Sequence, residues 1–237
     1  MKKRALCQSL KSDSRSLNNK KNQTIKMAKS EIVVEDKKEL SSATPGFIID
    51  PEDIDIPKVN LVQKMSQIDG PLGSIMLDQK HCIAEADVPV GVSIVSARKG
   101  WREDIPFDED EMPRIAWNHD DRDALEAESG YKILEFADIR ILFHGGEDAD
   151  QTVYNVPIGD EQYALGRINV QKDAYRNTYK RLATFAAVNN GADLSSKVWN
   201  MKSILLTKGK YSWYCPSLEN SPEVASEGVI QFLKMFQ

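Results

Sequence analysis

The segment from Leu205 to Asn220, LLTKGKYSWYCPSLEN, concentrates the residue types that bind an unpaired polynucleotide strand. Ammonium groups neutralise phosphates, and flat rings stack on unpaired bases at about 1 to 3 kcal/mol per base. Two interpretations follow: a stacking surface flanked by cations, or the aromatic core of an edge hairpin. The side chains concerned are two lysines and three rings within seven residues, Lys208, Lys210, Tyr211, Trp213 and Tyr214.

Side-chain alternation divides these rings between two faces of a strand. Tyr211 and Trp213 are expected on one face, with Trp199 across from them, while Tyr214 points the other way. One face of such a hairpin is normally buried, so we expect about half of the rings to be core. The stacking interpretation then requires that at least one of the three hairpin rings is exposed beside the lysines.

The wider region from residue 167 to 214 repeats this combination of cations and rings. It holds nine Lys and Arg residues against Asp173 and Asp193, together with Tyr175, Tyr179 and Phe185. The stretch VQKDAYRNTYKRLATFAAVNNG predicts one amphipathic helix from about Val170 to Asn190, with these three rings on its apolar face and Gly191 after its end. Three cations repeat every four residues on another face and are predicted to contact phosphates, Lys172, Arg176 and Lys180.

The net charge of −5 conceals blocks of opposite sign. Residues 1–30 hold nine Lys and Arg residues and a single acid, Asp13, with almost no apolar periodicity, which predicts a disordered basic arm. Residues 102–128 hold eleven acidic residues against three arginines. Because local field decides where a polyanion settles, the basic block near the C-terminus outweighs the overall negative charge as a predictor of binding.

Catalytic patterns are weak. The run from Asp108 to Glu111 offers carboxylates for a Mg²⁺ ion, but consecutive acids cannot all face one ion, and such runs are usually solvated surface. His81, His119 and His144 lack the spacing of a zinc site, and no serine-hydrolase or P-loop motif occurs. We therefore expect neither an enzyme nor a cofactor or metal, with a metal-dependent nuclease as a distant alternative.

Composition is that of a globular protein. The chain has 237 residues, 41% of them hydrophobic, and no apolar run approaches the roughly 18 residues of a membrane span. Three isolated cysteines indicate neither a disulfide framework nor a cysteine-rich zinc site. The sequence predicts a cytoplasmic protein without membrane contact.

Short β-branched and apolar runs, separated by Gly and Pro, predict a mainly β protein of the α+β class. Strands are expected near residues 75–77, 88–95, 132–143, 152–157 and 162–168, followed by a hairpin around Lys208 and Gly209. An OB-like small barrel or a curved antiparallel sheet, with one internal helix and a C-terminal helix, accounts for this order best. The predicted divisions are a basic arm (1–30), an extended lead-in (31–57), an OB-like nucleic-acid-binding domain (58–218) and a C-terminal helix (219–237). The domain contains an acidic insertion at about 102–130, with a short helix near 122–128. The C-terminal helix is expected to have Ser221 as its N-cap.

Several short motifs resemble a group of single-stranded-DNA-binding proteins of tailed phages and prophages. They are IPKVNLVQKMSQ, GSIML, SARKGWRED, YRNTYKRL and VWNMKSILLTKGKYSWYCPSL, spread over residues 55–218. The resemblance implies coating of single strands during replication or recombination, without catalysis, in the cytoplasm of a host cell. It implies roles in binding for Lys208, Lys210, Tyr211, Trp213 and Tyr214, and also for Lys99, Trp101 and Arg102.

One departure from that group concerns the C-terminus. Many members end in an acidic tail that recruits partners, whereas this chain ends in FLKMFQ. The acidic segment 102–128 could recruit replication or recombination proteins instead, and an adaptor that binds such a partner or mimics nucleic acid is the second hypothesis. Association with further copies of the chain stays open.

Overall fold

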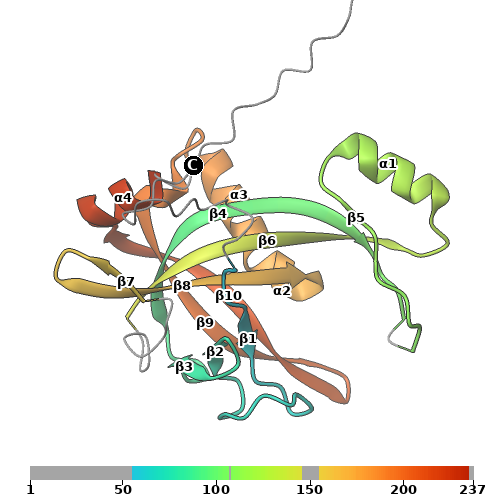
Figure 1. Ribbon diagram of the computed structural model, residues 1–237, viewed down its shortest axis with the longest axis horizontal. Coiled ribbons are helices and arrows are strands. Elements are labelled where there is room, and N and C mark those ends of the chain that lie inside the picture. Colours follow the sequence, from blue (N-terminus) through green and yellow to red (C-terminus); the bar gives the residue numbers. More distant parts are fainter. Residues whose placement is uncertain (1–54, 107, 146–154, 235–237) are drawn as a thin grey trace, which may run out of the picture. The chain divides into compact units, whose positions relative to one another are not determined.

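The computed structural model describes residues 55–106, 108–145 and 155–234 (Figure 1). The predicted basic arm and nearly all of the predicted lead-in lie outside these residues. In chain order the elements are β1 (Val59–Leu61), β2 (Ile75–Leu77), β3 (His81–Ala84), β4 (Val90–Glu103), β5 (Ile115–Ala116), α1 (His119–Glu128), β6 (Ile133–His144), β7 (Asn155–Ile158), β8 (Glu161–Gln171), α2 (Lys172–Asn177), α3 (Tyr179–Val188), the 3-10 helix η3 (Leu194–Ser196), β9 (Lys197–Lys208), β10 (Tyr211–Val224) and α4 (Glu227–Lys234).

Antiparallel strands dominate the architecture. β1, β2 and β3 form a small sheet in that order, and the large sheet has the order β10-β9-β4-β6-β8-β7, with β5 added to β4. The long strand β4 has a register shift between Ile94 and Ser96, a bulge that bends it so that its two ends meet different partners. The mainly β, α+β class predicted from the sequence is confirmed, and the strands of the described residues do not form a closed barrel.

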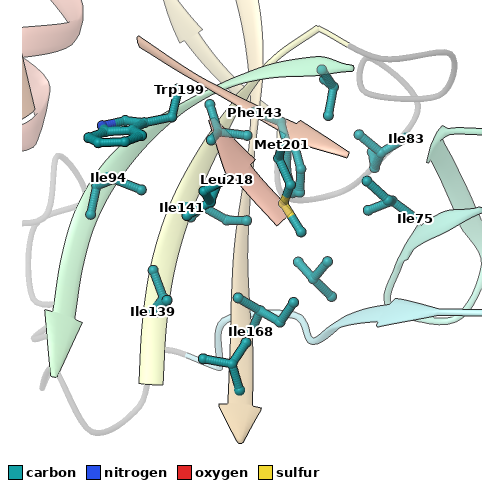
Figure 2. Close-up of a cluster of buried hydrophobic side chains, with 14 of the residues drawn as sticks. Ile75, Ile83, Ile94, Ile139, Ile141, Phe143, Ile168, Trp199, Met201 and Leu218 are labelled. Carbon is teal, nitrogen blue, oxygen red and sulfur yellow. The ribbon is translucent and has the colours of Figure 1, made fainter. Parts of the chain in front are cut away.

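The main core lies on the inner face of the large sheet. Figure 2 shows apolar residues of neighbouring strands converging there, including Ile94, Ile141, Trp199 and Met201. Ile75 and Ile83 of the small sheet join the same cluster. Leu182 of α3 is also buried in this cluster. The period-two alternation that predicted these strands is therefore satisfied by burial of one face.

The predicted internal helix is two helices. β8 extends to Gln171, and α2 and α3 meet at Thr178, whose φ of −121° and ψ of −84° are not helical. The Thr178 hydroxyl donates to the carbonyl of Ala174 at 2.6 Å, which caps the end of α2. The rings of Tyr175 and Tyr179 still stack across the break, with centroids 5.2 Å apart. The helical spacing of apolar residues in the sequence therefore continues across a break between two helices.

The prediction for the C-terminal segment is wrong in its boundary. Ser221 is buried within β10, which continues to Val224, and α4 begins only at Glu227. Ser226 is the helix cap, because its hydroxyl accepts from the Val229 amide at 3.4 Å. Pairing with β9 outweighs the local Ser-Pro signal, since Val224 is still paired with Lys197.

The acidic insertion is folded rather than a plain loop. It contains β5 and α1, and α1 starts at His119, three residues before the predicted position. Asn118 caps the helix by accepting from the Asp121 amide at 2.8 Å. In Figure 1 this segment lies beyond one end of β4 and β6.

The free edge of β10 is covered by side chains. The Gln63 amide exchanges two hydrogen bonds with the Tyr214 backbone, each 2.8 Å long, as a paired strand would. Further along, Arg181 of α3 donates to the Leu218 carbonyl at 2.9 Å. The segment before β1 also contacts β8, because the Arg167 amide of β8 donates to the Pro57 carbonyl at 2.8 Å. The segment around β1 thus connects β8 with β10, and such cover protects an edge from unwanted pairing.

Candidate nucleic-acid interface

Cations from three strands and from the residue just before β1 meet on the outer face of the large sheet. Ser96 of β4 is paired with Arg140 of β6, Arg140 with Arg167 of β8, and Arg167 with Lys58 just before β1. Paired positions project to the same face, and neighbouring strands lie about 4.8 Å apart. Three cations therefore stand in one row. With two further outward residues of β4 they form what we call the arginine face: Lys58, Arg98, Arg102, Arg140 and Arg167.

Asp138 is the carboxylate that lies among these cations. It is paired with Arg98 across the β4–β6 ladder, and the Nε atom of Arg167 is 3.7 Å from one of its oxygens. Burial raises the pKa of Asp138 above its ordinary value, while Arg167, Arg140 and Arg98 act in the opposite direction. One carboxylate among five cations leaves an excess of positive charge on this face.

An indole ring borders the arginine face. The Arg98 guanidinium lies 4.4 Å from the centroid of the Trp117 ring. The Trp117 and Phe136 rings meet edge to face, with their centroids 5.1 Å apart. Gly100 makes this packing possible, since a Cβ there would lie 2.7 Å from Phe136 and 2.9 Å from Trp117. Between these rings and β1 the surface forms a hollow of about 440 Å³.

An ion pair between the buried carboxylate of Glu103 and the exposed side chain of Arg114 holds the segment that carries Trp117. Arg114 donates to the Glu103 carboxylate from Nε at 3.1 Å and from an Nη at 2.9 Å, and its backbone amide donates to the same carboxylate at 2.8 Å. These hydrogen bonds lower the pKa of Glu103 to about 2. The pair therefore fixes β5 against β4 and sets the position of Trp117 one residue beyond it.

Helix α4 limits the exposed part of the outer face. Its Val229 and Leu233 pack against Leu142 of β6 and Tyr163 of β8 in a second apolar cluster. Leu142 is two residues from Arg140 on the same face, so the covered region ends where the arginine face begins. The outer face is thus divided into an apolar half under a helix and a cationic half open to solvent.

The hairpin predicted from LLTKGKYSWYC forms as expected, and one of its rings is largely exposed. The turn consists of Gly209, at φ +61°, and Lys210. Tyr211 is 65% exposed, and the Lys210 ammonium lies 5.3 Å from its ring centroid. Trp213 is half-buried on the same face. The requirement of an exposed ring beside Lys208 and Lys210, which are both exposed, is met by Tyr211.

The other two rings considered with the hairpin have structural roles. Tyr214 packs against Gly73, where an added Cβ would lie 2.3 Å from its ring. Trp199 is 2% exposed, and its partner in β10 is Asn220, whereas Trp213 is paired with Leu206. The expectation that Trp199 lies across from Trp213 is wrong, because the register places them at different ends of the hairpin.

The predicted helical cations lie around one small hollow, but two of them have acidic partners. The Lys172 ammonium is 3.1 Å from Asp104, and Arg176 is 3.3 Å from Asp173. The Lys180 ammonium lies 5.8 Å from the centroid of the buried Tyr175 ring. These three helical cations therefore offer less unpaired positive charge than their four-residue spacing in the sequence predicts.

The β4 residues singled out by resemblance are divided between the two faces of the sheet. Lys99 and Trp101 project to the inner face, where Lys99 pairs with Glu135 at 2.5 Å and Trp101 is 6% exposed. A ring so buried has no face for a base, which corrects the role inferred for Trp101. Arg102 projects outward and belongs to the arginine face.

Sequence reasoning missed Lys58, Arg98, Arg140 and Arg167 as a group. A signal was present for two of them, because Arg140 and Arg167 stand at outward positions among mainly apolar residues, in FADIRIL and ALGRINV. That signal identifies an unusual residue in each strand but does not reveal which strands are neighbours.

One hydroxyl–imidazole pair connects β4 with β6. The Ser93 hydroxyl lies 2.7 Å from Nε2 of His144, but Ser93 is fully buried, and burial lowers the pKa of His144. Within the described residues, no group of three or more His, Cys, Asp or Glu side chains could hold a metal ion.

Comparison of the chain with protein-family models, with curated proteins and with solved structures finds no match. None of the helices in the described part of the chain combines the length and apolar character needed to cross a membrane.

Proposed function

We propose that this protein binds single-stranded DNA through the arginine face and the Lys208–Tyr211 turn, and that it supports phage or prophage replication or recombination without catalysis. The row of Arg140, Arg167 and Lys58 is the observation that carries the proposal. Like charges at paired positions of a sheet disfavour folding. A polyanion that lies along the row removes this repulsion and releases counterions.

The strand order supports an OB-like version of this proposal. Counted along the chain, β4, β6, β8, β9 and β10 correspond to five strands with α2 and α3 between the third and the fourth. OB folds bind oligonucleotides on the face of their second and third strands, between the first loop and the last. Here these strands are β6 and β8, which carry Arg140 and Arg167. The first loop then contains α1, and the last is the Lys208–Tyr211 turn.

Fluorescence anisotropy of the full chain with labelled single-stranded and double-stranded oligonucleotides tests the proposal. We expect binding to the single strand, weaker binding to the duplex, and a linear fall of log K with log salt concentration. RNA of the same sequence serves as a third probe. Absence of binding to the single strand at low salt would refute the proposal, and magnesium-dependent cleavage of the probe would favour the nuclease alternative.

The second candidate function is that of an adaptor, and the exposure of α1 favours it. Of its ten residues only Leu125 is buried, while Asp120, Asp121 and Asp123 are exposed. An acidic helix so loosely attached could bind a basic replication or recombination partner. An adaptor without DNA affinity would give no anisotropy change with any oligonucleotide, which separates the two functions in the same experiment.

A further inference from the structure

The hollow beside the arginine face has a lining that phosphate binding alone does not explain. It is about 440 Å³ in volume and opens between β1, β6, β8 and the segment with Trp117. Cations and amide groups line it, as expected for a phosphate site. The Asp138 carboxylate also lines it and would repel a phosphate. The side chains used in the argument are Lys58, Asn60, Arg102, Trp117, Asp138 and Asn169.

Asp138 retains its capacity to accept hydrogen bonds. Its side chain is 21% exposed, and its nearest ion-pair partner, Nε of Arg167, lies at 3.7 Å, which is longer than a hydrogen bond. Asn169 stands at the paired position in β8, and Asn60 lies on the same side two residues beyond Lys58. The hollow therefore offers an acceptor pair with amide groups next to it and an indole at its border.

The edges of the four DNA bases meet such a carboxylate differently. Guanine presents two adjacent donors, N1–H and the N2 amino group, which match the two oxygens of one carboxylate. Adenine and cytosine present one amino group beside an acceptor nitrogen. Thymine presents a single N–H between two carbonyl oxygens, which a carboxylate repels. Unpaired bases are read through this edge when they are splayed from a single strand.

We propose that this hollow binds one unpaired guanine base of the DNA strand, with Asp138 accepting from N1–H and the N2 amino group. This inference rests on the proposed function and adds a base preference to it. Trp117 contacts the base from the border of the hollow, and Arg102, Lys58 and Arg167 contact the neighbouring phosphates. The arginine face binds the phosphates of a strand of any sequence, and Asp138 adds a preference for guanine at one position.

The test compares labelled oligothymidine with the same strand carrying one central guanosine, adenosine, cytidine or inosine. The full chain should bind the guanosine strand about fivefold or more tightly than oligothymidine, as a bidentate base contact does. Inosine lacks the N2 amino group and should lose most of this gain. Equal affinity for all five strands would overturn the inference while the proposed function stands, whereas absence of binding to every strand would overturn both.

Two variants complete the experiment. Asp138→Asn should abolish the preference for guanosine and at the same time raise affinity for oligothymidine, because a negative charge near the strand is removed. Asp173→Asn removes one charge from α2, outside the hollow, and should leave the preference for guanosine unchanged. If Asp138→Asn binds all strands more tightly but keeps the preference, Asp138 only balances the arginines and the inference is wrong.

Discussion

Replacing the row of cations one residue at a time gives a sharp test, because binding and stability should change in opposite ways. For a single strand, each phosphate contact contributes a salt slope of about 0.7. At 0.15 M salt this corresponds to about 0.6 of a decade in affinity, or roughly 0.8 kcal/mol. Arg140→Gln, Arg167→Gln and Lys58→Gln should each weaken binding about fourfold, and the triple variant roughly 50-fold.

Arg140→Gln in particular should not destabilise the protein. Arg140→Gln removes a like charge paired with Arg167 and leaves the Arg167–Asp138 ion pair in place. Like charges opposite each other in a sheet cost roughly 0.2 to 1 kcal/mol. The free energy of unfolding measured in urea should therefore stay constant or rise by up to about 1 kcal/mol. A residue kept for its structural role would show a fall instead.

Anisotropy titrations at several salt concentrations provide the assay, and Lys80→Gln is the matched control. Lys80 is an exposed lysine in the turn between β2 and β3, with Asp78 3.9 Å away. The Lys80→Gln substitution changes the net charge by the same amount as each substitution in the row, but it lies outside the arginine face. If Lys80→Gln flattens the salt slope as much as Arg167→Gln does, the row has no special part in binding and the reasoning is refuted.

Three further predictions concern the hairpin, the helix edge and acid stability. Tyr211→Ala should weaken oligonucleotide binding by about 1 to 3 kcal/mol at unchanged melting temperature, whereas Tyr214→Ala should lower stability by on the order of 2 kcal/mol because its ring packs on Gly73; the reverse pattern would exclude Tyr211 as the stacking ring. The combined change of Lys172, Arg176 and Lys180 to Gln should reduce the salt slope of binding by about 0.7. The reason is that, among the described residues, only Lys180 of these three lacks an acidic partner within ion-pair distance. A reduction near 2 would show that all three side chains contact phosphates. Because Arg114 lowers the pKa of folded Glu103 from 4.5 to about 2, the stability that this carboxylate contributes is present above pH 4.5 and is lost as the pH falls through that interval; melting curves of Glu103→Gln should lack this part of the acid transition, and an unchanged pH profile would contradict the assignment.

The sequence by itself determined the local elements of this protein. Alternating apolar residues predict the strands around residues 75–77, 132–143 and 162–168, and the Gly209–Lys210 turn predicts the hairpin, because each signal depends on neighbours in the chain. It also determined that Tyr211 and Trp213 share a face and stand close to lysines. A local signal failed at Ser221, where the pairing of β10 with β9 keeps the residue within a strand, and the helical periodicity did not reveal the break at Thr178.

Only the tertiary structure decided which cations act together. Lys58, Arg98, Arg140 and Arg167 are separated by 27 to 42 residues, and they meet because β1, β4, β6 and β8 are neighbours in one particular register. A shift of one residue in that register would turn each arginine into the core. The register is set by burial of the opposite face, where Ile94, Ile139 and Ile141 pack with residues as far apart in the chain as Val59 and Leu218. The sequence around any single arginine does not reveal which strands become neighbours, which is why the row is visible only once the sheet is assembled.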